Sequence, residues 1–440
     1  MRRAMRQLAA GVLALAALGA RAEDPPAEEA WGARGQATYI QQRKPGFDAA
    51  YSARNSLSPD RERSYTLTAT AYLGVRPWHG GELYLDAEVG QGLAFSNLTG
   101  LAGFTNGEVT RVSGPDPRLY RQRLFLRQTW NQGGGSERLE SDLNQLAGTV
   151  DRNRVVLTAG NFSLLDVFDG NAYAHDPRSQ FMNWGNMTYA AYDYAADSRG
   201  FGWGFAAEWY RDEWVLRLAR MTPPREPNQL PLDYRFFKHY GDQLELERAH
   251  TLAGRPGRLR LLAWRNRAVL ARYRDAIDLG ARSAQPPDIF KVRYGEQVKY
   301  GFGVNLEQSV AEHAGVFLRA MRADGRSETL AFTEADASLA AGASLSGGAW
   351  GRARDTLGVA ALRNFASKDR RDYLAAGGIS FFIGDGALRY RPEDTVEVYY
   401  GFALARAASL SIDWQRIANP AYNADRGPVA FYGLRLHAEF

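Results

Sequence analysis

Polar and apolar residues alternate at nearly every step along residues 64–92, with one break at Gly80 and Gly81. A repeat of two residues is typical of a β-strand whose faces meet different surroundings. Two such runs joined through a Gly-Gly step predict a β-hairpin. Its apolar face carries Tyr65, Leu67, Ala69, Ala71, Leu73, Val75, Leu83, Leu85, Ala87 and Val89, and its polar face includes Thr66, Thr68, Thr70, Tyr72, Arg76, Glu82, Tyr84, Asp86 and Glu88.

This alternation fits two folds that differ in which face meets solvent. A soluble β-sandwich buries the apolar face between two sheets. A membrane β-barrel turns the apolar face toward lipid and keeps the charges in its lumen. One hairpin fits both, so the rest of the chain has to distinguish them.

Similar alternating runs recur along the chain and predict about sixteen strands. They fall at 34–43, 64–78, 81–92, 119–130, 153–162, 200–210, 213–220, 240–250, 257–267, 296–307, 314–323, 329–342, 351–363, 394–405, 408–417 and 429–440. An even number is typical of single-chain bacterial barrels. Residues 369–378 are interpreted as a short helix within a loop, because a strand there would make the count odd.

The connections between these runs alternate in length. Short connections fall at 79–81, 211–212, 311–315, 346–350 and 405–408, and long ones at 44–63, 92–118, 162–198, 221–239, 268–295, 364–393 and 418–428. Short periplasmic turns and long extracellular loops are typical of an antiparallel up-and-down barrel in the outer membrane. The connection 131–152 is an exception, since it occupies the place of a short turn and is long.

The first 22 residues have the features of a signal peptide. A basic start is followed by the apolar segment 8–20, which is too short to span a bilayer, and by the cleavage pattern Ala20-Arg21-Ala22. A membrane-anchoring helix is the alternative. We expect residues 23–440 to form one barrel domain. Removing residues 1–22 lowers the formal net charge from +5 to about +1, which argues against a nucleic-acid partner.

Two further features favour the barrel over the sandwich. The chain has no cysteine, so an exported protein of this length needs a closed sheet or a large core in place of disulfides. The last run, 429–440, ends in the aromatic residue Phe440, which looks like the terminal signal by which the barrel assembly machinery recognises its clients, although an aromatic ending also occurs by chance. We therefore expect the apolar face of residues 64–92 to meet lipid, with Tyr65 and Trp78 in the aromatic girdles.

Several segments resemble the OprB-type carbohydrate-selective porins of Gram-negative bacteria. They are 55–74, 96–108, 124–130, 144–148, 157–184, 192–204, 232–243 and 419–440. The resemblance runs through almost the whole mature chain. It implies a sixteen-stranded outer-membrane barrel, in contact with lipid and lipopolysaccharide, that passes glucose and other monosaccharides by passive diffusion without a cofactor. Porins of this kind occur as monomers or as homotrimers.

A sixteen-stranded barrel encloses an aqueous channel, so selectivity needs a constriction. We expect the longest loop, 162–198, to fold inward and narrow the pore; an extracellular cap is the alternative. Within it, Asp169, Asn171 and Trp184 are candidate constriction residues.

The strands before this loop carry candidate solute-binding charges. Arg121, Arg123 and Arg127 are predicted to share one lumen-facing row, opposite a row of acids on the preceding strand, Glu82, Asp86 and Glu88. Opposed rows of charge orient polar solutes, and Tyr84 offers a face for the C–H groups of a sugar ring. The alternative is that these charges only pair with one another.

Other functions find less support in the residues. The chain contains neither a G-x-S-x-G nor an H-E-x-x-H pattern, so we expect no catalytic residues and no metal site. A general or anion-preferring diffusion porin remains the alternative to a carbohydrate porin.

Overall fold

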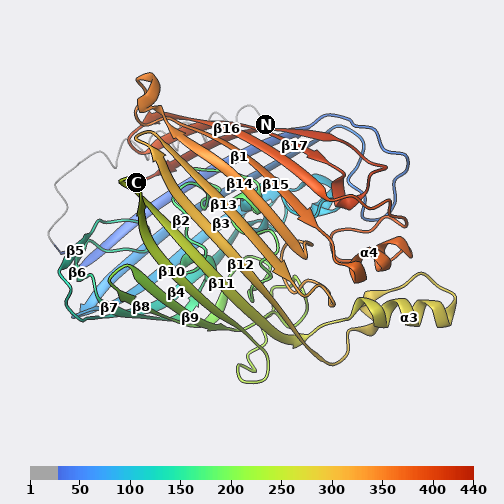
Figure 1. The fold of residues 1–440 in the computed structure, drawn as a ribbon, viewed down its shortest axis with the longest axis horizontal. Helices are drawn as coiled ribbons and strands as arrows, with labels where there is room; N and C mark the ends of the chain where they lie inside the picture. The colour runs from blue at the N-terminus through green and yellow to red at the C-terminus, as the bar shows by residue number, and fades with distance from the viewer. Residues whose placement is uncertain (1–27) are drawn as a thin grey trace.

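The computed structural model describes residues 28–440, and sixteen of its strands close into one antiparallel barrel (Figure 1). The predicted signal peptide, residues 1–22, lies outside the described residues. The wall consists of β1 (Trp31–Lys44), β2 (Glu62–Trp78), β3 (Gly81–Leu93), β4 (Arg118–Asn131), β7 (Arg154–Phe162), β8 (Gly202–Arg211), β9 (Trp214–Met221), β10 (Tyr240–Leu252), β11 (Arg255–Val269), β12 (Glu296–Ala311), β13 (Ala314–Ala323), β14 (Ala337–Ser346), β15 (Thr356–Phe365), β16 (Glu393–Ala405), β17 (Ala408–Ala418) and β18 (Val429–Glu439). The prediction of a sixteen-stranded barrel is confirmed.

The apolar face of the β2–β3 hairpin is the outer face of the barrel. Leu73 and Leu85 pair across the hairpin and are 49% and 41% exposed, whereas their neighbours Tyr72 and Asp86 are buried toward the interior. A shift of one residue would place every charge of the strand outside, so the alternation specifies the orientation strongly.

Two strands lie further along the chain than the alternation predicted. The run expected at 329–342 is β14, Ala337–Ser346, and the run expected at 351–363 is β15, Thr356–Phe365. The physical reason is that β14 has small residues on both faces, which weakens the pattern. The apolar residues 330–332 before it are buried in a loop inside the molecule and mimic a strand.

The short turns and the long loops lie at opposite ends of the barrel (Figure 1). The long-loop end carries α3 (Tyr273–Ser283) and α4 (Lys368–Ala375), and α4 overlaps residues 369–378, where a helix in a loop is expected. The remaining helices are α2 (Trp184–Met187) and the 3-10 turns η1 (Phe95–Leu98), η2 (Gly107–Arg111), η3 (Leu164–Asp166), η4 (Ile289–Val292), η5 (Gly347–Trp350) and η6 (Pro420–Tyr422). Among the described residues, no helix is both long and apolar enough to cross a bilayer.

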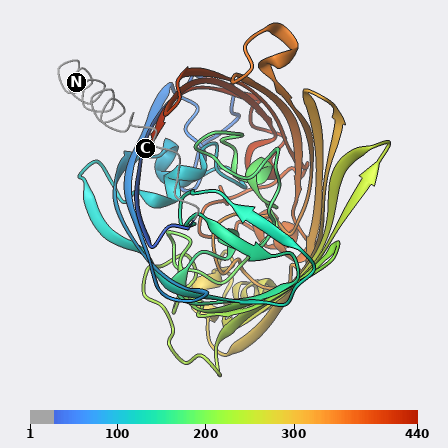
Figure 2. The same ribbon diagram turned by 90° about the vertical axis from the view of Figure 1, so that its left-hand side faces the viewer.

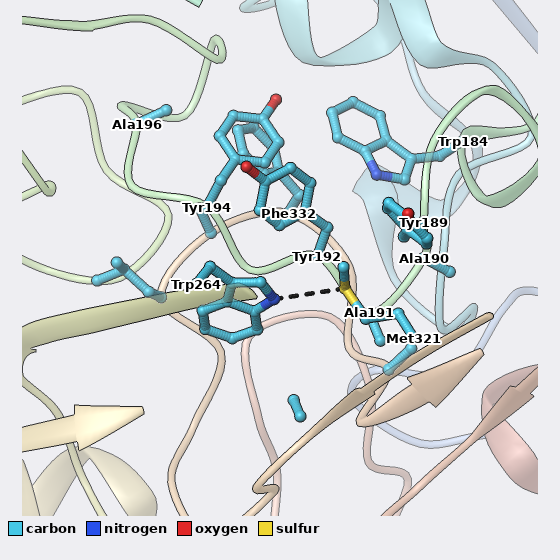
Figure 3. Packing of buried hydrophobic residues seen from close by; sticks show 14 of the residues in the cluster. Trp184, Tyr189, Ala190, Ala191, Tyr192, Tyr194, Ala196, Trp264, Met321 and Phe332 are labelled. Atoms are coloured by element: carbon cyan, nitrogen blue, oxygen red, sulfur yellow. Dashed lines mark hydrogen bonds between the residues drawn. The ribbon is translucent and has the colours of Figure 1, made fainter. Parts of the chain in front are cut away.

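The connection between β7 and β8, residues 163–201, runs inside the barrel and is called the inner loop here. Figure 2 shows it in green within the ring of strands. Its aromatic residues pack against those of the wall and of the loop before β14 (Figure 3). The ring centroids of Trp184 and Tyr194 lie 4.8 Å and 4.6 Å from that of Phe332, and Tyr192 contacts Trp264 of β11. The apolar core of this protein therefore lies inside the barrel and fills part of the lumen.

The long connection 131–152 forms a second, smaller sheet. Strands β5 (Ser136–Leu139) and β6 (Gly148–Asp151) pair with each other and not with the barrel. Between them, the Leu146 amide donates to the Tyr84 hydroxyl at 3.1 Å, and the Asn144 side chain donates to Asp86 at 2.9 Å. The hairpin therefore folds back into the short-turn end of the barrel (Figure 2).

Candidate functional site

The inner loop is tied to the wall by buried polar contacts. Asp169 is fully buried, and its carboxylate accepts from Arg319 of β13 at 2.9 Å, while its amide donates to Glu245 of β10 at 2.9 Å. Asn171 donates to Asn305 of β12 at 2.7 Å. A buried charge is tolerated only when it is paired and hydrogen-bonded, and this arrangement satisfies both requirements.

A second set of contacts holds the middle of the same loop. Glu397 of β16 accepts from the backbone amides of Met182 and Asn183 at 2.6 Å and 3.0 Å. The next residue, Trp184, is 3% exposed and packs between Phe332 and Phe104. Of the three residues predicted in this loop, Asp169 and Asn171 anchor it to the wall, and Trp184 packs against two other loops inside the barrel.

Arg178 connects the inner loop to the opposite side of the barrel. Its guanidinium bonds to Glu88 of β3 at 2.9 Å, to Glu108 of η2 at 3.1 Å and to the Tyr72 hydroxyl at 3.0 Å. Glu88 is fully buried and also accepts from Thr70 at 2.6 Å. Glu88 therefore positions the loop and has no free acceptor face toward the lumen.

The next pair toward the short-turn end is more accessible. Arg123 of β4 bonds to Asp166 of the inner loop at 2.7 Å and to Asp86 of β3 at 3.1 Å. Asp86 is fully buried behind the arginine, whereas the Asp166 side chain is 29% exposed. The ion pair joins wall and loop and presents the Arg123–Asp166 edge to the lumen.

Arg127 and Glu82 form the third level of this charged wall. Their closest atoms are 3.7 Å apart, and the Glu82 carboxylate accepts from the Tyr84 hydroxyl at 2.9 Å. The Arg127 guanidinium lies 5.3 Å from the centroid of Tyr84 and 5.4 Å from that of Phe125. Tyr84 is 2% exposed and stacks on Phe125, so its ring packs beneath the Arg127 guanidinium. Arg127 and Glu82 line the lumen cavity, whereas Tyr84 does not.

These groups border a cavity of about 670 Å³ between the wall, the inner loop and the β5–β6 hairpin. Its charged lining contains six arginines and five carboxylates, namely Arg76, Arg123, Arg127, Arg154, Arg178, Arg217, Glu28, Glu82, Asp142, Asp166 and Glu208. Tyr72, Phe125 and Tyr210 contribute aromatic surface to the same cavity. Of the predicted site residues, Arg123, Arg127 and Glu82 therefore meet in one aqueous space.

Arg121 does not share the row of Arg123 and Arg127, which corrects the prediction. Asp86 pairs with Arg123 and Ala87 pairs with Arg121, so Gln122 is an extra residue in β4. Before this β-bulge the alternation is reversed: Gln122 bonds to the buried Glu88 inside the barrel. Arg121 lies on the outer face, and its guanidinium is 5.1 Å from the ring centroid of Trp203.

The far side of the cavity was not predicted as part of the site. Arg217 of β9 bonds to Glu208 of β8 at 3.1 Å, and the Tyr210 hydroxyl donates to Glu208 at 2.7 Å. The alternation of β8 places Glu208 on the inner face, and that signal could have identified it. The contribution of the β5–β6 hairpin depends on contacts that are distant in sequence, so no local pattern reveals it.

Comparison with known proteins decides the family. The model of the family described as carbohydrate-selective porin, OprB family, matches residues 59–440. The chain belongs to the OprB family of carbohydrate-selective porins. As an OprB-family porin it is an outer-membrane protein, and its family and fold are those of a channel rather than of an enzyme.

One solved structure in particular shows the same fold, and others are similar over most of the chain. The OprB-family chain is similar to the high-pH structure of Pseudomonas putida OprB, with a TM-score of 0.69, 14% identity and coverage of 93% of this chain and 94% of that one. The low-pH structure of the same protein gives a TM-score of 0.49 at 12% identity, covering 93% of each chain. The outer-membrane channel DcaP of Acinetobacter baumannii also gives 0.49, at 8% identity over 93% of this chain and 97% of that one. A search of the curated proteins finds no match.

Proposed function

We propose that the chain passes monosaccharides such as glucose by passive diffusion, and that the cavity between the inner loop and the β5–β6 hairpin is the narrow part of the route. The near balance of six arginines and five carboxylates around the cavity supports this proposal. Opposed charges orient a neutral polar solute without excluding it, whereas an excess of one sign would select ions.

The chemistry of the lining also suits a sugar. Arginine–carboxylate pairs offer both donors and acceptors to ring hydroxyls, and their planar guanidinium groups donate in fixed directions. Tyr72, Phe125 and Tyr210 offer apolar surface to the C–H faces of the ring. Arg123, Arg127 and Glu82 are the proposed contact residues. We expect weak binding, because a solute that binds tightly is not released.

Liposome swelling tests the proposal. Vesicles containing the protein should take up glucose faster than vesicles without it, and we expect reversal potentials near zero in a chloride gradient. Arg127→Ala should change the rate of glucose uptake several-fold. Arg363→Ala is the matched control, since Arg363 lies outside the cavity, bonded to Asp394.

A strong chloride or phosphate preference that Arg127→Ala abolishes would support the anion-preferring porin instead. Equal uptake of sugars of all sizes by both variants and the unaltered protein would indicate a general porin.

We also propose, from the sequence, cleavage after residue 22, recognition of Phe440 by the barrel assembly machinery, contact with lipid and lipopolysaccharide, and assembly as a monomer or homotrimer. Edman sequencing of the purified protein checks the first, and mass measurement in detergent checks the last.

A further inference from the structure

The barrel wall is shorter at β7 and β8 than at the neighbouring strand β4. β4 pairs with β7 only from Leu124, opposite Asn161, to Asn131, opposite Arg154. Within the described chain, residues 118–123 of β4 therefore pair with β3 alone. β8 begins at Gly202, level with the end of β7 at Phe162. The wall therefore has a notch beside the upper part of β4, at the long-loop end.

A second cavity, of about 330 Å³, lies at this notch. It is lined by Tyr120, Arg121, Asn161, Asp197, Arg199, Phe201, Trp203, Arg225, Leu230, Pro231, Leu232 and Tyr234. None of these residues lines the larger cavity of the lumen. The notch is therefore a separate space from the proposed solute route.

The loop between β9 and β10, residues 222–239, forms the outer border of the notch. Phe236 of this loop contacts Phe205, which belongs to the outer face of β8, with ring centroids 6.0 Å apart. The loop projects from the lower edge of the barrel in Figure 1. Its Tyr234 and Phe237 are 63% and 85% exposed. The notch thus opens on the outer surface, next to exposed aromatic side chains.

Three arginines face this cavity without a salt bridge to any carboxylate among residues 28–440. The guanidinium of Arg121 lies over Trp203 and that of Arg199 lies 4.0 Å from the centroid of Tyr120. Arg225 donates its Nε–H to the Leu232 carbonyl at 3.2 Å. The Nε of Arg199 is buried and has no hydrogen-bond partner in the described structure.

This lack of partners contrasts with the lumen, where Arg123, Arg178 and Arg217 each bond to carboxylates. The nearby acid, Asp197, accepts from the backbone amides of Arg199 and Phe201 at 2.9 Å and 3.1 Å and so stabilises its own loop. The notch therefore presents a net positive charge, with guanidinium groups free to donate.

Planar guanidinium groups bind phosphate through paired N–H donors, and several of them together favour a multiply charged anion. The position also limits the source of the anion. Trp203 is the second residue of β8, so the cavity lies at the long-loop, outer-leaflet end, at the level of an interfacial aromatic girdle. The exposed rings of the 222–239 loop suit the acyl region of an amphiphile.

We propose that the notch is a binding site for the phosphate group of an outer-leaflet glycolipid, held by Arg121, Arg199 and Arg225. The site needs only the outer-membrane barrel, and it does not depend on which solute the lumen passes. Failure of the sugar proposal would therefore leave it intact.

The test uses the full-length protein in detergent and native mass spectrometry with lipid A as the probe. We expect bisphosphorylated lipid A to bind at least tenfold more tightly than the same lipid without phosphates. The double variant Arg121→Gln/Arg225→Gln should lose at least tenfold in affinity, and Arg199→Gln alone should lose severalfold. The control is Arg265→Gln, an exposed arginine elsewhere at the long-loop end.

Single-channel conductance of the same variants in planar bilayers shows that they remain folded, since none of the three arginines lines the lumen cavity. Equal affinity for the phosphate-free lipid, or unchanged affinity in both variants, would overturn the site. Inorganic phosphate serves as the second arm: if it binds the unaltered protein as tightly as lipid A does, the site is for free phosphate and the lipid assignment is wrong.

Discussion

Glu88 illustrates how single carboxylates are accommodated inside this barrel. It is fully buried and accepts from Arg178 at 2.9 Å and from Gln122 and Thr70 at 2.6 Å each. The Glu88 carboxylate holds Arg178 against β3, and because Arg178 belongs to the inner loop, it also positions that loop. A residue chosen from sequence as a solute ligand is therefore better understood as a part of the scaffold.

Glu88→Gln should lower the free energy of unfolding by about 1.5–3 kcal/mol, the usual worth of hydrogen bonds to a charged group. Arg178 keeps Glu108 as a partner, which limits the loss. Urea titration of the protein in lipid vesicles, followed by tryptophan fluorescence, measures it. Glu137→Gln is the control: Glu137 is half-exposed on the hairpin and its pair with Arg154 should be worth under about 1 kcal/mol. Equal losses in both variants would contradict this account.

At Arg121, the alternation of polar and apolar residues no longer predicts which face of the sheet a side chain occupies. Arg123 and Arg127 were correctly placed on the inner face, because β4 alternates regularly after Gln122. The bulge adds one residue to β4, so the residues before it point to the opposite faces from those that the alternation predicts. No feature of the sequence at 119–123 indicates the bulge. A bulge depends on the pairing of two strands, so one strand alone does not specify it.

At the scale of elements, the β5–β6 hairpin and the inner loop both line the lumen cavity. Residues 142–145 and 148–150 of the hairpin connection line the cavity from the short-turn end, and Asp166, Gly170 and Arg178 line it from the loop. The hairpin is attached to the wall by several bonds. Asn144 and Leu146 bond to β3, Arg127 of β4 donates to the Asn144 carbonyl, and Arg154 of β7 bonds to Glu137.

Replacing residues 133–152 by an Asn-Gly turn should raise single-channel conductance and speed the uptake of disaccharides. The shorter chain removes groups from the cavity while β4 and β7 keep their own ladder from Leu124–Asn161 to Asn131–Arg154. Planar-bilayer recording checks the conductance. Shortening the α3 loop, residues 273–287, is the control and should leave it unchanged. An unchanged conductance after removal of the hairpin would show that the constriction lies entirely in the inner loop.

Sequence alternation located most wall elements because each strand separates lipid from the interior. It failed for β14, where Ala340, Ala341 and Gly342 offer no contrast between the faces. The anchors of the inner loop, Asp169 with Arg319 and Met182 with Glu397, join residues more than a hundred positions apart. Such partners are set by closure of the barrel, which a single sequence does not display.

At the scale of the whole molecule, lipid is the solvent of the outer surface, so a charged side chain there destabilises the barrel. Leu85→Arg, on the outer face of β3, should lower the free energy of unfolding by about 2–4 kcal/mol, the range for a basic residue near the bilayer midplane. Leu252→Arg, at the short-turn end of β10, should cost at most about 1 kcal/mol. Unfolding in vesicles measures both. Similar costs at the two positions would place Leu85 outside the apolar belt.

The long-loop end should loosen in acid. Burial raises the pKa of Asp336, but the attraction and hydrogen bonds of Arg370, at 2.8 Å, outweigh it and hold that pKa below its usual value. Stabilisation by this pair is present above the ordinary carboxyl pKa, near 4, and is lost as the pH falls through the lower value of the folded state. Limited proteolysis between pH 6 and pH 2 should show cleavage in residues 324–336 only at the acid end, and Asp336→Asn should show it at pH 6. Cleavage that does not depend on pH would refute the role of the pair.

The barrel is sealed where its first strand meets its last. β1 and β18 pair from Gln36–Glu439 to Arg43–Tyr432, and Phe440 exchanges two backbone hydrogen bonds with Gly35. The ring of Phe440 lies so close to Gly35 that a methyl group there would approach it to 2.5 Å. Contacts of such large sequence separation are formed late, since the entropy of closing the longest possible loop is lost before they form. Until that last joint is made, both strands expose unpaired edges, so the unsealed chain is the form most in need of a chaperone.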